Sequence, residues 1–147
     1  MTTIFEALRA DHDAQRTLVE ILTKTEGDSE GRNEIWAKLK SELTAHAAAE
    51  ERYFYVPLLE SDVTQDAARH SVAEHKELND FIEQIDGYEM SGSQWIQTAR
   101  ELGERLLHHL EEEEVEMFPV AGKVLDDAAK ESLATEYESD MTRRRKS

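Results

Sequence analysis

Four histidines recur at a fixed interval along this chain, and their spacing constrains its fold more than any other feature does. His12 and His46 are 34 residues apart, and His75 and His109 are separated by the same interval. The second histidine of each pair is followed four residues later by a glutamate. A pattern written twice in step is typical of a duplicated helical hairpin with a two-fold metal site between its helices.

The two histidine–glutamate pairs each place an imidazole and a carboxylate on one face of a helix, because residues four positions apart are neighbours there. Each of the four histidines also falls within the apolar stripe of its segment. A carboxylate buried without a partner is costly or takes up a proton, and a cation removes that cost. We therefore expect six metal ligands: His12, His46, Glu50, His75, His109 and Glu113.

The chemistry of this donor set narrows the choice of metal. Four imidazoles and two carboxylates suit iron, manganese or zinc, and carboxylates that bridge two metals favour divalent iron. For one such histidine alone, a core side chain with a local hydrogen bond is the simpler interpretation. Four histidines that share the inner helix faces with two glutamates favour a metal site over four separate core side chains.

A third histidine–glutamate pair competes with these two. His108 and Glu112 have the same four-residue spacing, but His108 shares its helix face with Glu101 and Arg105. His70 is likewise out of phase with the apolar stripe of its own segment. We expect both of these histidines to face water.

The hydrophobic period is helical throughout, and no segment alternates as a strand would. It predicts five helices: residues 3 to about 26, 32 to about 57, one that ends near 87, 91 to 119, and 124 to 141. Four long helices joined by short loops predict an all-α fold, an up-down-up-down antiparallel four-helix bundle with a short additional C-terminal helix.

Local signals mark several of the helix ends. Thr3 with Glu6 matches a capping box for the first helix, and Ser91 with Gln94 matches one for the fourth. The two prolines lie where the second and fourth helices are expected to be interrupted.

The chain length of 147 residues fits one domain. We expect residues 1–122 to form the metal-binding bundle, with residues 123–147 as a C-terminal helix and basic tail packed on the same domain. The basic run at 143–146 is interpreted as a solvated tail whose charge suits the end of a helix.

Composition excludes several classes of function. The net charge of −16 argues against nucleic-acid and anionic-membrane binding. No apolar run approaches the roughly 20 residues that a membrane span needs, and no secretory signal is visible, so we expect a cytoplasmic protein. There is no cysteine, no HExxH and no Glu-x-x-His, which excludes thiolate sites, zincin proteases and the ferritin-like ligand motif.

Four stretches of the sequence carry a resemblance to a known family: Asp11-His12-Asp13, His46 to Glu51 running into Phe54-Tyr55, Glu74-His75, and His108 to Glu114 running into Phe118-Pro119. Together they resemble the hemerythrin-like family of HHE cation-binding domains. The resemblance implies a four-helix bundle that holds a non-haem centre of two iron ions, with an oxo or hydroxo bridge. The resemblance also implies that such a centre binds or reacts with dioxygen, peroxide or nitric oxide.

The chain departs from the oxygen-carrying hemerythrins at one ligand. Those proteins place a further histidine where this chain has Glu113, and they use an aspartate beyond it. The set of four histidines and two glutamates leaves a coordination position open, for which Tyr53 is a candidate phenolate ligand, with aromatic packing as its other interpretation. Family members that repair iron–sulfur clusters use a cysteine-bearing segment, so the absence of cysteine disfavours that role.

The open position favours a redox reaction, because catalysis needs a vacant site. A catalase-like or peroxidase-like reaction with peroxide is our first hypothesis, with nitric oxide as another substrate and an unidentified redox partner in the peroxidase case. Reversible dioxygen binding or scavenging is the alternative, and iron or metal buffering without turnover is the third.

Overall fold

The computed structural model describes residues 1–146, which form helices joined by short loops. A helix labelled η is a π-helix, whose hydrogen bonds span five residues instead of four. The elements are α1 (Ile4–Thr23), α2 (Glu30–Glu50), η1 (Glu51–Tyr55), α3 (Val56–Leu59), α4 (Gln65–Asp86), α5 (Ser93–Glu112), η2 (Glu113–Met117), α6 (Phe118–Val124) and α7 (Asp127–Arg145).

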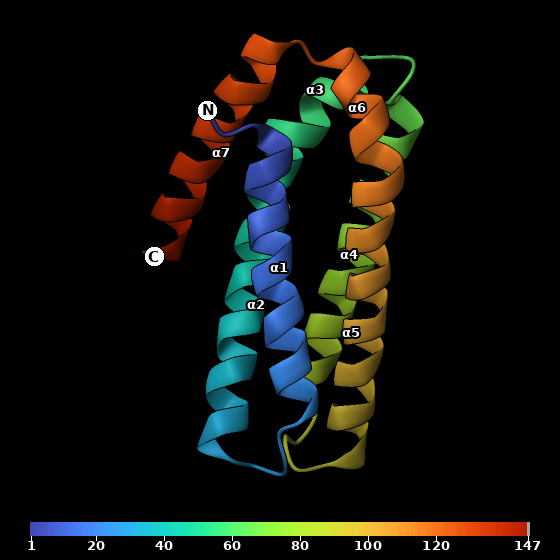
Figure 1. Ribbon diagram of the computed structural model, residues 1–147. Coiled ribbons are helices and arrows are strands. Elements are labelled where there is room, and N and C mark those ends of the chain that lie inside the picture. Colours follow the sequence, from blue (N-terminus) through green and yellow to red (C-terminus); the bar gives the residue numbers. More distant parts are fainter. Residues whose placement is uncertain (147) are drawn as a thin grey trace.

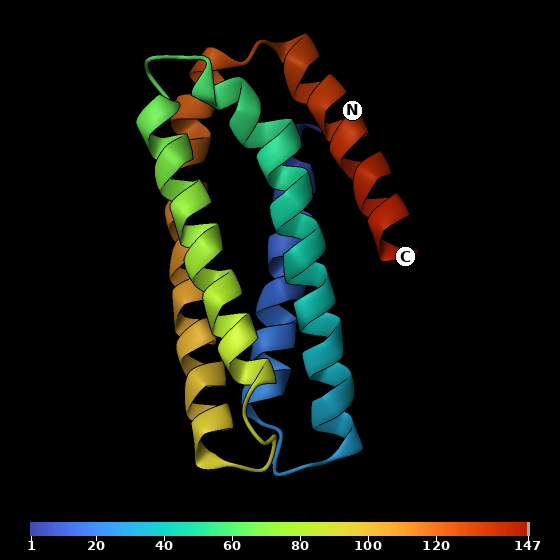
Figure 2. The ribbon, with the colours of Figure 1, turned by 180° about the vertical axis from the view of Figure 1, so that it is seen from behind.

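The four long helices α1, α2, α4 and α5 run alternately up and down and form a bundle (Figure 1, Figure 2). The loops at 24–29 and 87–92 lie together at one end of the bundle, and the connections after α3 and α6 lie at the other end (Figure 1). The predicted all-α antiparallel bundle is confirmed.

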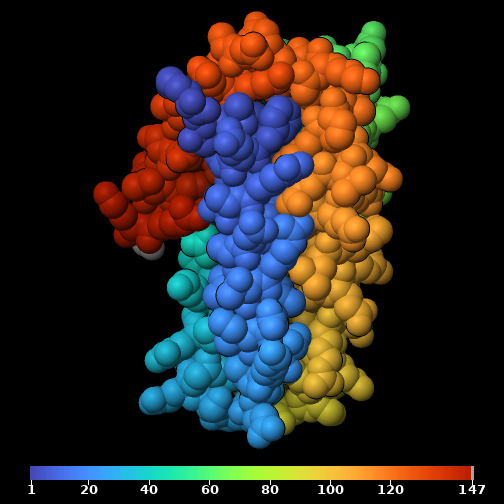
Figure 3. Space-filling model, in the orientation of Figure 1, coloured from blue at the N-terminus to red at the C-terminus, as the bar shows by residue number. Residues whose placement is uncertain are grey.

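The additional C-terminal helix, α7, is 19 residues long and lies outside the bundle along α1 and α2 (Figure 2). In the space-filling view α1 lies between α7 and the α5 side of the molecule (Figure 3). Arg143, Arg144 and Arg145 of the basic run form the last turn of α7, and Lys146 is its C-cap. Arg145 in that turn donates hydrogen bonds to Glu42 of α2 and Asp11 of α1.

The first capping box is confirmed and the second is wrong. Thr3 Oγ1 accepts from the Glu6 amide at 3.3 Å, and the Glu6 carboxylate accepts from the Thr3 amide at 3.1 Å. At α5 the N-cap is Gly92, with an extended backbone, and no side chain caps the helix. Ser91 therefore lies one residue too early to form a box with Gln94.

Both prolines are preceded by a π-helical turn, so the chain continues as a helix through them. A proline has no amide hydrogen, and its ring collides with the carbonyl group four residues earlier in a regular helix. In each case the residue before the proline donates to a carbonyl five residues back: Val56 to Glu51, and Phe118 to Glu113. The wider turns accommodate the prolines and change the angular phase of every residue that follows.

The apolar core consists of two clusters. One includes Leu8, Phe54 and Phe118 together with Tyr137 of α7, and the other includes Trp36, Trp95 and Leu102 near the opposite end. The expected ligand side chains are buried polar residues that belong to neither cluster. The fold thus holds a set of buried histidines and glutamates among apolar side chains.

Candidate metal centre

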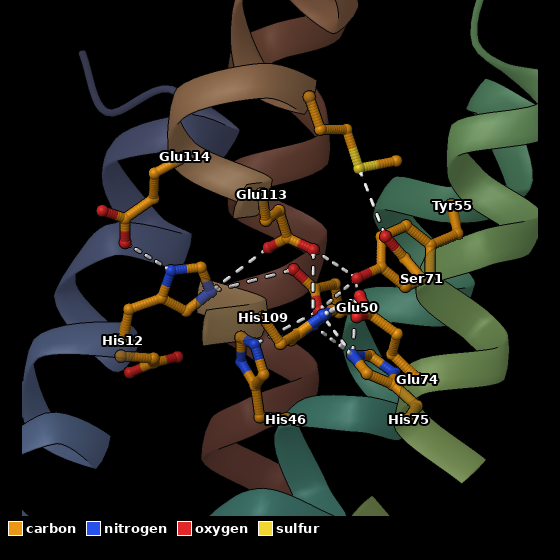
Figure 4. Close-up of polar contacts among 12 residues, drawn as sticks. His12, His46, Glu50, Tyr55, Ser71, Glu74, His75, His109, Glu113 and Glu114 are labelled. Atoms are coloured by element: carbon orange, nitrogen blue, oxygen red, sulfur yellow. Dashed lines mark hydrogen bonds and ion pairs between the residues drawn. The ribbon is translucent and has the colours of Figure 1, made fainter. Parts of the chain in front are cut away.

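The six residues predicted as metal ligands come together in the interior of the bundle (Figure 4). All are buried, with His75 the most exposed at 7%. They come from every long helix, since α1 carries His12, α2 carries His46 and Glu50, α4 carries His75, and α5 and the start of η2 carry His109 and Glu113. All six side chains therefore lie on the inner face of the bundle, as helical phase predicts.

The first group is formed by His12, His46 and Glu50. The Nε2 atom of His46 lies 3.3 Å from Oε1 of Glu50, and Nε2 of His12 lies 3.9 Å from Oε2 of the same carboxylate. One ligand atom from each of the three residues lies within 4.8 Å of the other two. This spacing suits a single metal ion held by two imidazoles and a carboxylate.

The second group shares Glu50 with the first. His75 Nε2 lies 3.1 Å from Glu50 Oε1 and 3.2 Å from His109 Nε2. Glu113 lies between the groups, with Oε1 at 3.3 Å from His12 Nε2 and Oε2 at 3.8 Å from His109 Nε2. Glu50 thus belongs to both groups, and Glu113 lies near one histidine of each, which is the placement that bridging ligands require.

The buried donors lack partners of their own, and this is the test of whether the residues fit a cation. Buried polar side-chain atoms nearly always have a hydrogen-bond partner. Among the residues described, four donor atoms of the site have none: Nε2 of His12, Nε2 of His46, Oε2 of Glu50 and Oε1 of Glu113. Imidazole nitrogens and carboxylate oxygens that converge in the core without a hydrogen bond of their own fit metal cations.

Two outer ring nitrogens are held directly by carboxylates. His12 Nδ1 lies 2.7 Å from Glu114, which also accepts a hydrogen bond from Arg16. His109 Nδ1 lies 2.8 Å from Glu74 of α4. A carboxylate on Nδ1 fixes the proton there and turns the Nε2 lone pair toward the metal position. Glu74 is adjacent to His75 in the sequence, but neither partner could be assigned from helical phase alone.

His46 is held through α7. Its Nδ1 atom lies 2.5 Å from the Tyr137 hydroxyl, and that hydroxyl donates to Asp11 at 2.6 Å. Asp11 in turn accepts from Arg145 at 2.8 Å. The sequence signal for Tyr137 was only its place in the apolar stripe of the last helix, which does not reveal its hydrogen bonds. His75 differs from the others, because its Nδ1 has no hydrogen-bond partner within the described chain.

The phenol in the site belongs to Tyr55 and not to Tyr53. Tyr55 is buried, and its hydroxyl donates to Glu50 at 2.9 Å and also to Glu113 (Figure 4). Tyr53 is partly buried against the apolar cluster that includes Phe54 and Tyr137, and the guanidinium of Arg52 lies 5.5 Å from its ring centre. The π-helical turn of η1 explains the difference, since it brings a residue five positions after Glu50 onto the same face.

The charges of the site depend on one another. Burial and the charge of Glu50 raise the pKa of Glu113 to about 7. Burial opposes the charge of Glu50 as well, but His46 and further hydrogen bonds hold its pKa well below the usual range. Burial also opposes protonation of His12 and His109, yet the facing carboxylates raise the pKa of both. In the absence of a cation, these shifts favour proton binding by Glu113, His12 and His109.

A separate histidine–glutamate group lies on the surface. His70 Nε2 and His108 Nε2 each lie 3.1 Å from Glu112, and Glu74 lies beside them. The two histidine side chains are 58% and 70% exposed, so both face water as predicted. Because water and mutual contacts satisfy these groups, they do not require a cation as the buried set does.

Two cavities flank the buried donors. One of about 40 Å³ is lined by His46, His75 and His109 together with Gln15 and apolar side chains. The other, of about 130 Å³, is lined by Glu113 and by Ser71 and other residues of α4, η2 and α6. Small molecules therefore have room on two sides of the site.

Known proteins resemble this chain in sequence and in fold. The model of the hemerythrin HHE cation binding domain matches residues 3–121. A DNA nickase of Nostoc sp. (strain PCC 7120 / SAG 25.82 / UTEX 2576) is 26% identical over 136 residues, which make up 92% of this chain and 38% of the nickase. The chain thus spans less than half the length of that relative.

Among solved structures, the crystal structure of a hemerythrin HHE cation binding domain-containing protein from Mycobacterium kansasii shares the fold. Its TM-score is 0.89 at 23% identity, over 99% of this chain and 88% of that chain. The domain match runs from the residue that caps α1 into α6 and includes all six buried donors. The chain therefore belongs to the hemerythrin HHE cation-binding domain family.

Proposed function

We propose that the buried donors hold two iron ions and that the iron-loaded protein consumes hydrogen peroxide. The observation that carries the proposal is the pair of two-histidine, one-carboxylate groups that share Glu50. Two histidines and one carboxylate with open positions are the ligand set of many non-haem iron enzymes. Glu113 supports the same assignment as a second carboxylate between the groups.

The number of donors supports a reactive centre over a closed structural one. Six protein side chains leave coordination positions of two iron ions free for a small molecule, and a vacant position is what metal-ion catalysis needs. Iron there would supply the electrons for reactions of peroxide, dioxygen or nitric oxide. Disproportionation of two peroxide molecules to dioxygen and two waters needs no outside reductant, so a catalase-like reaction requires no redox partner.

The chain's own residues supply the proton positions around the site. Burial beside two carboxylates raises the pKa of the Tyr55 phenol well above its usual value, so it remains a hydrogen-bond donor to Glu50 and Glu113. Apolar side chains from all four long helices limit the access of bulk water. These residues hold protons in fixed places while the site stays largely dry.

We infer that the ligand is a small molecule and not a nucleic acid. The net charge of −16 opposes association with DNA phosphates. The DNA-cleaving activity named for the Nostoc relative belongs to a protein of which this chain spans 38%. No helix of the described chain has the length and apolar character of a membrane span.

Reversible dioxygen binding is the second candidate, and the small cavity with apolar walls beside three of the histidines favours it. A carrier holds a stable oxygen adduct and turns over little peroxide. A metal buffer without redox turnover binds iron tightly and does neither.

The test is to load the protein with ferrous iron, measure iron per chain and the absorption spectrum, and then follow dioxygen release after peroxide is added. Two irons per chain with rapid dioxygen release support the proposal. Two irons with a stable oxygen adduct and no release would favour the carrier, and a protein that retains no iron would refute both.

Two variants on α4 provide the matched comparison. His75→Ala removes an expected ligand and should abolish dioxygen release, whereas His70→Ala changes an exposed histidine on the same helix and should leave it unchanged. Equal loss in both variants would show that the buried group is not the reactive site.

A further inference from the structure

Gln15 buries both polar atoms of its side chain without a hydrogen bond. It lies on α1, three residues after His12, and is fully buried. Neither Oε1 nor Nε2 has a partner among the residues described. A leucine or methionine would continue the apolar stripe at this position without that cost, so an amide here indicates a partner that is not part of the protein.

Gln15 lines the cavity of about 40 Å³ that three of the buried histidines also line. Most of its remaining wall is apolar, with leucines and Ile82 among the lining residues. A cavity needs about 10–15 Å³ of such space for each water molecule. The space therefore suits a molecule of two to four non-hydrogen atoms.

We propose that Gln15 binds hydrogen peroxide in this cavity, an inference that rests on the proposed function and names a residue that binds its substrate. Hydrogen peroxide both donates and accepts hydrogen bonds, so it satisfies Oε1 and the Nε2–H group of the amide together. Dioxygen and nitric oxide carry no proton and leave Oε1 without a partner. Gln15 thus favours peroxide over both gases and holds it beside His46, His75 and His109.

The test compares Gln15→Met with wild type and with Gln84→Met, an exposed glutamine on α4. Methionine has nearly the length of glutamine and no hydrogen-bonding amide. In the iron-loaded Gln15→Met protein we expect KM for peroxide to rise about tenfold or more, equivalent to about 1.4 kcal/mol, while kcat changes far less. The rate of oxidation of the ferrous protein by dioxygen should stay at the wild-type value, as should every property of Gln84→Met.

A second readout needs no iron. The metal-free Gln15→Met protein should melt a few degrees above the metal-free wild type, because two unpartnered buried polar atoms are removed. Gln15→Leu is made in parallel, so that a folding defect of one replacement does not decide the result. Iron content should match wild type in both variants.

The possible outcomes separate this inference from the proposed function. A wild type that releases no dioxygen from peroxide refutes the proposed function and this inference together. A wild type that does so, with unchanged KM in both Gln15 variants, refutes the inference alone and leaves only a water in the cavity. Iron content below wild type in both variants would make Gln15 part of the metal-holding set and would also overturn the assignment.

Discussion

A metal-binding histidine uses one ring nitrogen for the metal, and the partner of the other nitrogen determines how the ring is held. In this protein Glu114, Tyr137 and Glu74 each contact the Nδ1 atom of a buried histidine. The Nε2 atoms therefore face the centre of the bundle before any metal arrives. Removing a ligand and removing one of these orienting partners should have different consequences.

Replacing His109 by alanine should remove metal and stability together. The variant loses one ligand, and Glu113 and His75 stay buried without the cation that offsets their burial. We expect iron per chain to fall to half of wild type or less and the melting temperature of the loaded protein to fall with it. Iron analysis and thermal unfolding measure the two effects.

The adjacent residue is the control for this change. His108 is exposed and carries the competing sequence pattern, so His108→Ala should keep the wild-type iron content and melting temperature. A metal-depleted His108→Ala protein beside a fully loaded His109→Ala protein would overturn the assignment of the inner histidine.

Tyr137→Phe should weaken metal binding without removing a ligand. The change deletes the hydroxyl that accepts the Nδ1–H of His46 and donates to Asp11. Loss of such an orienting partner typically lowers metal affinity about 10–100-fold, and competition with a chelator measures it. Tyr53→Phe is the control, because Tyr53 packs against the apolar cluster outside the site. Equal affinity in the two variants would mean that α7 does not orient His46.

At the scale of the helices, the sequence predicts the site well wherever the helix is regular. His12, His46, His75 and His109 all lie within α-helices, where the 3.6-residue period assigns the inner face correctly. Tyr55 lies at the end of a π-helical turn, so the same period pointed to Tyr53 instead. A proline two residues further on is the one local signal of that turn, and it does not say how wide the turn is.

Close packing between α1 and α5 depends on a glycine. A Cβ atom on Gly103 would lie 2.9 Å from Val19 Cγ1, and the branched, buried valine has few other rotamers. We expect Gly103→Ala to destabilise the protein in urea unfolding, because overpacking costs about 1–3 kcal/mol against a gain of up to about 1 kcal/mol in helix propensity.

Gly122 of α6 is the matched control for that substitution. The nearest atom to an added Cβ there is Phe5 Cζ at 4.0 Å, an ordinary contact distance. Gly122→Ala should therefore stabilise the protein by up to about 1 kcal/mol. If Gly103→Ala is stabilising too, α1 and α5 can separate at little cost, and the close approach does not hold the bundle together.

At the scale of the whole molecule, the two halves are related by a shift of 63 residues, which carries His12 to His75 and His46 to His109. The supporting residues break this symmetry. Glu74 reaches His109 directly, whereas Asp11, its counterpart with a shorter side chain, reaches His46 through Tyr137 of α7. The repeat could be read from the sequence, but the asymmetry could not, because it depends on where the extra helix packs.

The same buried charges predict opposite pH dependence for the metal-free and loaded proteins. In the metal-free fold the pKa of Glu113 is raised from 4.5 to about 7, and those of His12 and His109 are raised above 6.5. Protons bound to these groups stabilise the fold below their unfolded pKa values, and this contribution is lost as pH rises through the folded values. Glu50 has a lowered pKa and stays ionised across this range.

The melting temperature of the metal-free protein should therefore fall between about pH 5 and pH 8, whereas that of the loaded protein should rise, because metal ligands must be deprotonated to bind. The metal-free Glu113→Gln variant lacks the carboxyl that titrates near pH 7, so its melting temperature should fall less steeply. Thermal unfolding at a series of pH values measures all three slopes. A metal-free wild type that becomes more stable toward pH 8 would show that the buried groups carry no excess protons, and the site would then need no cation to replace them.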